Sequence, residues 1–234
     1  MNFAILSMDG VLFLLRWMHF LFGVTWIGLL YYFNFVQGPF FAETDASTKS
    51  GAIQKLVPRA LLWFRWSALW TVVTGLLILS IRGHMAGPGI FATSWGVAIL
   101  TGMTLGLCMA YNVWFIIWPN QKIVIQSATQ VASGGAALPN AAAAGARAGV
   151  ASRTNTLFSI PMLFFMGAAS HLPIEIGANA NFGALAAVLA VLIGALEVNA
   201  MKGKTGPMTT VRGVIHCGVG LAVVMYVIVE LLTK

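Results

Sequence analysis

The stretch VLFLLRWMHFLFGVTWIGLLYYFN, residues 11–34, decides the fold class of this chain. It is long enough to cross the hydrocarbon core of a bilayer, which takes about 20 residues of α-helix. Comparable apolar stretches follow at residues 60–81, 94–118, 154–171, 181–201 and 210–232. The sequence therefore predicts an all-α, polytopic membrane helix bundle of about six transmembrane helices.

The composition agrees with a lipid environment and excludes a water-soluble fold. Of the 234 residues, 59% are hydrophobic and only 8% are charged, whereas a soluble domain has about 25% charged residues. We expect residues 1–234 to form a single integral-membrane domain. The first span has no basic n-region and no small-residue cleavage site, so it is expected to be retained and not removed as a signal peptide.

Charged residues predict the orientation in the membrane. The formal net charge is +7, and Lys and Arg concentrate in the connections after the first, third and fifth spans. Nine lie on that side, namely Lys49, Lys55, Arg59, Lys122, Arg147, Arg153, Lys202, Lys204 and Arg212, against Arg16, Arg82 and Lys234 on the other. By the positive-inside rule both termini should be non-cytoplasmic, in a bacterial inner membrane. Such a charge excess predicts topology, so no nucleic-acid partner is expected.

The long connection at residues 119–153 is rich in Ala and Gln and contains Gly134, Gly135 and Pro139. We expect two short helices there, lying at the cytoplasmic interface. The chain has two cysteines, Cys108 and Cys217, and no CxxC or CxxCH motif. This excludes a disulfide framework, a zinc knuckle and covalently attached c-type haem.

One polar stripe runs along the first span. On a helical wheel it falls within an arc of roughly 80°, and its members are Arg16, His19, Gly23, Trp26, Leu30, Asn34 and Gln37. Polar groups in a span need a structural or functional reason, because lipid offers them no partner. His19 could coordinate a group held between helices, with Gly23 leaving space for it. Alternatively, His19 forms a hydrogen bond across the bundle and Gly23 serves close helix packing.

Two further intramembrane histidines have a glycine one turn away on the same face: His171 with Gly167, and His216 with Gly220. His19 is expected roughly 10 to 15 Å below the outer surface, His171 near that surface and His216 in the inner half. We expect His19 and His171 to be the pair of ligands, with His216 as a less favoured alternative. His84 lies in a short outer loop, where an exposed histidine is the default.

Haem b suits a pair of membrane histidines. It needs one or two axial imidazoles, a slot between helices and cations for its propionates. Zinc or copper catalysis usually needs a third protein ligand, which the scarce intramembrane acids do not offer. Arg16 and Arg82 could hold the propionates, or they could be interfacial arginines that extend toward the headgroups.

Three segments carry a family resemblance: RWMHFLFGVTWIGLLYYFNFVQ (residues 16–37), YNVWFIIWPNQK (residues 111–122) and SRTNTLFSIPMLFFMGAASH (residues 152–171). In this order they resemble the membrane domain of the bacterial membrane-bound urate hydroxylases, also called the urate oxidase N-terminal domain. The resemblance implies a membrane oxidoreductase that hydroxylates urate to 5-hydroxyisourate and passes electrons to a cytochrome c. His19, His171, Arg16, Trp26, Asn155 and Pro161 fall within the matching motifs.

Full-length members of that family carry a C-terminal cytochrome c domain, and this sequence reaches Lys234 without a CxxCH motif. The resemblance then implies that electrons leave to a separate cytochrome c, a quinone or a partner subunit. The favoured hypothesis is a haem b oxidoreductase or electron-transfer protein, with urate as the candidate substrate and no catalytic residue assigned. The alternative is a non-catalytic subunit or assembly factor of a larger membrane complex, and a small-solute channel ranks third. In either case the chain could act as an oligomer or as part of a complex.

Overall fold

The structure, a computed structural model, describes residues 3–234, and these form only helices and their connections. The long helices of the bundle are α1 (Met8–Tyr31), α4 (Val57–Ala86), α5 (Ser94–Tyr111), α7 (Ala141–His171), α8 (Phe182–Lys202) and α9 (Val211–Thr233). The shorter α-helices are α2 (Gly38–Glu43), α3 (Ala46–Lys55) and α6 (Trp118–Ala132). Three 3₁₀ turns complete the connections: η1 (Ala4–Leu6), η3 (Pro88–Ala92) and η5 (Gly206–Thr209). The predicted all-α class is confirmed.

Two segments within the long helices are π-helical, η2 (Tyr32–Gln37) and η4 (Asn112–Ile117). Each continues an α-helix without a break, so α1, η2 and α2 form one rod of 36 residues, and α5, η4 and α6 form one of 39 residues. A π-helical turn contains one more residue than an α-helical turn and occurs often at functional sites.

Five helical rods are long and apolar enough to cross a membrane: Met8–Glu43, Val57–Ala86, Ser94–Ala132, Phe182–Lys202 and Val211–Thr233. Many of their large apolar side chains are exposed, for example Phe20 at 70% and Val191 at 74%. Such surfaces suit lipid and not water, and the chain is a multi-pass membrane protein. The sixth predicted span, residues 154–171, lies in α7, which is not among the five because polar residues interrupt its apolar sequence.

Residues 119–153 do not form two separate short helices, because each helical part belongs to a longer helix. They comprise most of α6, a break near residues 133–140 and the first part of α7. Pro119 lies in the first turn of α6, directly after the π-helical segment η4, and does not end the rod. The chain turns instead at Gly134, whose φ of +87° is the left-handed conformation that glycine adopts most readily.

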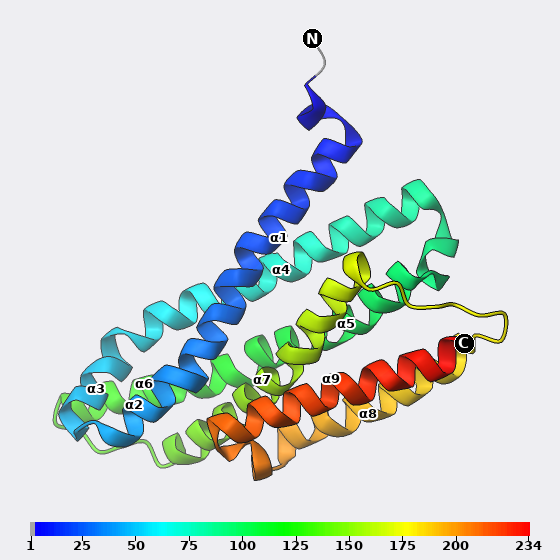
Figure 1. Cartoon of the computed structure of the whole chain (residues 1–234). Coiled ribbons are helices and arrows are strands. Elements are labelled where there is room, and N and C mark those ends of the chain that lie inside the picture. The colour runs from blue at the N-terminus through cyan, green and yellow to red at the C-terminus, as the bar shows by residue number, and fades with distance from the viewer. Residues whose placement is uncertain (1–2) are drawn as a thin grey trace.

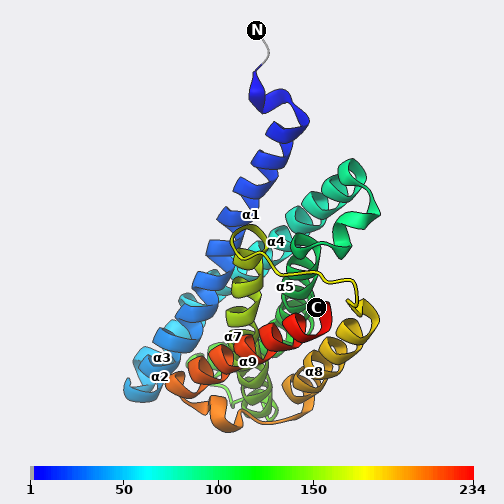
Figure 2. The same cartoon turned by 45° about the vertical axis from the view of Figure 1, so that its right-hand side comes forward.

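The helices alternate in direction around α7 (Figure 1). α7 packs against α5, α6, α8 and α9, while α1 packs mainly against α4. Figures 1 and 2 both show the first half of α1 leading away from the bundle toward the N-terminus. The corner formed by α2 and α3, the helix α6 and the α8–α9 connection lie at one end of the molecule, away from both termini (Figure 1). Most of the Lys and Arg residues therefore collect at that end.

Small residues allow α7 to lie close to its neighbours. On α5, Gly102 and Gly106 form a GxxxG pair, and a Cβ on Gly102 would lie 3.3 Å from the carbonyl oxygen of Met162. On α9, a Cβ on Gly218 would collide with the side chain of Ile160. Glycines at helix interfaces allow the backbones to approach, and van der Waals packing then stabilises helix association in lipid.

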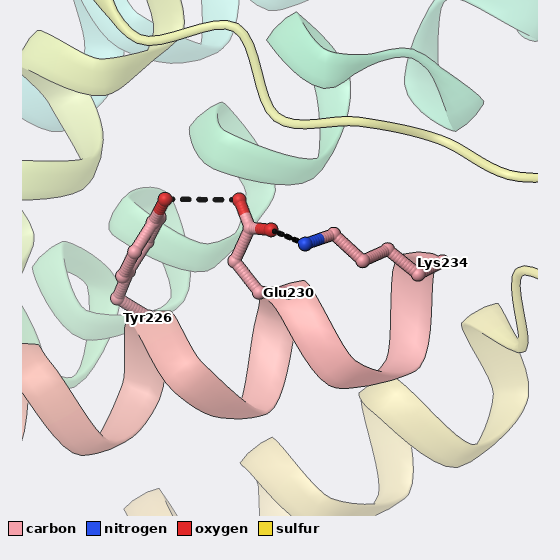
Figure 3. A network of polar contacts seen from close by, with 3 residues as sticks. All are labelled: Tyr226, Glu230 and Lys234. Atoms are coloured by element: carbon pink, nitrogen blue, oxygen red, sulfur yellow. Dashed lines mark hydrogen bonds and ion pairs between the residues drawn. The ribbon is translucent and has the colours of Figure 1, made fainter.

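The end of α9 is tied down by polar contacts. Tyr226 donates a hydrogen bond to Glu230 at 2.9 Å, and Lys234 forms an ion pair with Glu230 at 2.9 Å (Figure 3). The backbone N–H of Gly177 donates to the carbonyl of Thr233 at 2.7 Å, and that of Asn181 donates to Leu232 at 2.8 Å. These bonds satisfy carbonyls that the end of a helix leaves without partners, and they fix the loop between α7 and α8 to the end of α9.

Replacing Gly102 by Leu should separate α5 from α7. The new side chain has no space beside the Met162 carbonyl, and overpacking of this kind costs roughly 1–3 kcal/mol. We expect the Gly102→Leu variant to unfold at a lower temperature in detergent when helicity is followed by circular dichroism. Gly28→Leu is the matched control, because Gly28 is exposed and a Cβ there meets no atom within 4 Å. Equal melting of the two variants would contradict close α5–α7 packing.

Candidate functional site

His19 is the histidine that the fold holds in a defined position. It projects from α1 toward α4, where its Nδ1 lies 3.1 Å from the hydroxyl oxygen of Thr74. The ring rests against Gly75, since a Cβ on Gly75 would lie 3.1 Å from the Cε1 atom of His19. A larger residue at position 75 would therefore displace the imidazole.

The hydrogen bonds of Thr74 favour one tautomer of His19. The Thr74 hydroxyl lies within donating distance of the carbonyls of Trp70, at 2.7 Å, and Thr71, at 3.1 Å. A hydroxyl has one proton to donate, so toward His19 it acts as an acceptor. The neutral ring then carries its proton on Nδ1 and presents a free lone pair on Nε2, for which the described residues provide no partner. This is the arrangement found in metal-binding histidines, whose second nitrogen donates to an orienting group.

Two other residues of the polar stripe, Gly23 and Trp26, lie on the same face of α1 as His19. A Cβ on Gly23, one turn from His19, would meet no atom within 4 Å. Trp26 is 1% exposed, and its indole N–H has no hydrogen-bond partner in the described part of the chain. A buried donor without a partner is unusual, so this face of α1 combines a free imidazole lone pair, open space and an unpaired N–H group.

His171 is exposed at the last position of α7, and no contact joins it to His19. One contact gives the two helices a common reference point. The hydroxyl groups of Tyr31 on α1 and Ser159 on α7 are hydrogen-bonded at 3.0 Å, and His19 and His171 are each 12 residues from that contact toward the same end. The limits of the apolar stretches predict that His171 lies nearer the surface than His19. Measured from the helix contact, the two histidines are about equally far along their helices, roughly 18 Å.

The other predicted site residues are more scattered. Gly167 is exposed and has open space beside it, as Gly23 has. Arg16 is exposed, and the guanidinium of Arg82 stacks on Trp95 with 4.7 Å between its carbon and the ring centroid. His216 is exposed on α9 and His84 is exposed at the end of α4. The fold therefore positions His19 through side-chain contacts, whereas the remaining histidines lie at exposed positions.

The side chains that could act as metal ligands limit which cofactor fits the site. Within residues 3–234 no three His, Cys, Asp or Glu side chains lie close enough together to hold a metal ion. A metal bound by several protein ligands does not fit this pattern. A haem does, because it needs only one or two axial imidazoles, His19 offers one such imidazole, and Gly23 one turn away has open space beside it.

A buried polar network that the sequence prediction missed connects three helices near the middle of the bundle. The side-chain amide of Asn112 donates to the side-chain oxygens of Asn155 at 2.9 Å and Glu197 at 3.0 Å. Asn155 in turn donates to the carbonyl of Met109 at 2.9 Å. The network joins η4, α7 and α8. The signal in the sequence was the presence of Asn112 and Glu197 within apolar stretches, where polar residues require partners.

Asn155 should be the residue of this network on which stability depends most. It is fully buried, and Asn155→Leu would leave one Asn112 donor without a partner and remove the side-chain hydrogen bond to the Met109 carbonyl. Buried unpaired groups and hydrogen bonds between membrane helices suggest a loss of about 1–2 kcal/mol. The free energy of unfolding can be measured by titrating SDS into mixed micelles. Asn179→Leu, in the exposed loop after α7, provides the reference, and an equal effect of both substitutions would show that the network is not stabilising.

Comparisons with known proteins give one match. The sequence model of the family described as urate oxidase N-terminal matches residues 90–229. No curated protein and no solved structure matches the chain. The matched part includes Asn112, Asn155, His171 and Glu197, while His19 lies before it.

Proposed function

The chain belongs to the urate oxidase N-terminal family, and on this basis we propose that it is a membrane haem b oxidoreductase that oxidises urate to 5-hydroxyisourate. The observation that carries the redox part of the proposal is the geometry of His19, whose Nδ1 contacts the Thr74 hydroxyl while its Nε2 has no hydrogen-bond partner among the described residues. The family supports urate as the substrate.

The reaction requires an electron acceptor. When urate becomes 5-hydroxyisourate, it gains the oxygen atom of a water molecule and releases two protons and two electrons. The electrons would pass to a separate cytochrome c or to a quinone. With both termini on the non-cytoplasmic side of a bacterial inner membrane, as the charge distribution predicts, a cytochrome c could dock on that side.

His19 and His171 would hold the haem, and bound haem would supply one-electron redox chemistry. The role of this chain is to orient His19 through Thr74 and to limit the access of water to the site through the apolar helices. Trp26 offers an unpaired N–H group on the same face of α1. Arg82 interacts with Trp95 in the structure, so a contact between Arg82 and a propionate would require it to leave that ring.

An optical spectrum of the purified chain tests the cofactor. We expect a Soret band and an α-band after reduction by dithionite, and reduction by urate in place of dithionite. His19→Ala should abolish both bands because it removes the oriented ligand, and His171→Ala should abolish or shift them. His84→Ala is the control, since His84 is exposed at the end of α4. A colourless wild-type protein would favour a non-catalytic membrane subunit instead.

Thr74→Val tests the orienting hydrogen bond separately from ligation. The variant should keep its haem bands, because His19 remains, but its midpoint potential should shift since the Nδ1–H group loses its acceptor. Redox titration of the α-band measures this shift. An unchanged potential would show that Thr74 serves only the packing of α4, and Ser80→Val, at an exposed position on the same helix, controls for general effects of the substitution.

A further inference from the structure

A cavity of about 630 Å³ lies at the basic end of the bundle. Its walls come from η2, α2, α4, η4, α6, α7 and the connection between α8 and α9. The polar residues that line it are Asn34, Gln37, Gln121, Ser152, Arg153, Lys204 and Thr205. Cavities that bind small molecules usually have volumes of about 300–1,000 Å³, so its size suits a small organic ligand.

Both π-helical segments border this cavity. Phe33, Asn34 and Gln37 come from η2, and Ile117 comes from η4. A π-helical turn is rare and occurs frequently at functional sites. Two such segments bordering one cavity are therefore consistent with a binding site there.

The charge of the cavity is positive. Its lining includes Arg153 and Lys204 and no Asp or Glu. The one ion pair between side chains of residues 3–234 is that of Glu230 with Lys234, so Arg153 has no carboxylate partner within the described chain. The Nη1 atom of Arg153 is buried and makes no hydrogen bond there. Arg153 as a whole is partly exposed, so water offsets part of the cost of its unpaired charge, and an anion in the cavity would supply a counter-charge and a partner for Nη1.

The cavity also has a hydrogen-bond acceptor to offer. The side-chain oxygen of Gln37 is buried and has no partner among the described residues. The neighbouring amide of Asn34 is fixed in place, since it donates to the carbonyl of Leu30 at 2.9 Å and to the hydroxyl of Ser152 at 2.8 Å. A ligand that satisfies both Arg153 and Gln37 must carry negative charge and also a hydrogen-bond donor. Sulfate has no proton to donate at neutral pH, whereas hydrogen phosphate and an organic anion with ring N–H groups both combine the two properties, so phosphate is the competitor that the experiment must include.

We infer that this cavity binds the organic anion on which the chain acts, a flat heterocycle with ring N–H and carbonyl groups. The inference rests on the proposed function, under which this ligand is urate, a monoanion at neutral pH. Arg153 donates to an oxygen or ring nitrogen of the anion, Gln37 accepts from a ring N–H, and Lys204 adds positive charge at the α8–α9 connection. Arg153 and Gln37 are thus assigned as substrate-binding residues.

Urate binding to the purified full-length chain, measured by isothermal titration calorimetry, tests the assignment. Arg153→Gln should raise the Kd by about 10- to 100-fold, the loss expected for a hydrogen bond to a charged group. Arg153→Lys should cause a smaller loss, because the charge remains without the second nitrogen. Arg147→Gln is the matched control, since Arg147 is exposed on the same helix and does not line the cavity. Circular dichroism verifies that each variant is folded.

The outcomes separate the two proposals. Weaker binding to Arg153→Gln with unchanged binding to Arg147→Gln supports the cavity as the urate site. Tight binding that Arg153→Gln leaves unaltered would overturn the assignment of the cavity and leave the proposed function standing. Absence of urate binding by the wild-type chain would overturn the proposed function together with the site. Displacement of urate by an equal concentration of inorganic phosphate would show a general anion or headgroup site and would also overturn the assignment.

Discussion

The structure depends on enclosing the polar side of α7 within a membrane bundle. Lipid cannot hydrogen-bond to the polar side chains of this helix, so they must find partners on its neighbours. Asn155 bonds to Asn112 and to the carbonyl of Met109, while Ser159 bonds to Tyr31 and Ser152 accepts from Asn34. These contacts fix the axial positions of α5 and α1 relative to α7. The apolar helices around it then face lipid, which explains their many exposed apolar side chains.

This register has a chemical consequence for the two proposed sites. His19 and Asn34 are 15 residues apart on one continuous helical rod, which corresponds to roughly 22 Å along its axis. A ligand beside Asn34 and Gln37 therefore could not touch the imidazole of His19. Under the proposed function, substrate binding and the redox group occupy different ends of the bundle, and the oxidation of urate must proceed by electron transfer between them.

Hydropathy and helical spacing predicted the all-α class and the approximate positions of the long helices. Of the predicted stripe, Trp26, Leu30 and Asn34 are at most 6% exposed, whereas Arg16 is exposed. The same patterns could not predict the contacts between helices, because apolar side chains fit many partners about equally well. Arg153 illustrates the difference. In the sequence, Arg153 and Arg147 both count only toward the predicted topology. In the structure, Arg153 lines a cavity, whereas Arg147 is exposed. The three-residue network with Glu197 was missed for the same reason, since its members are far apart in the chain.

The π-helical segment η2 also sets the direction in which the cavity-lining side chains point. An extra residue in one turn rotates everything that follows by about 100° around the helix axis. Loss of that residue would restore an α-helix and turn Gln37 toward another direction, while α1 above it would keep its contacts with α4. Insertion or deletion of a single residue at this turn would thus redirect the side chains that line the cavity without rebuilding the bundle.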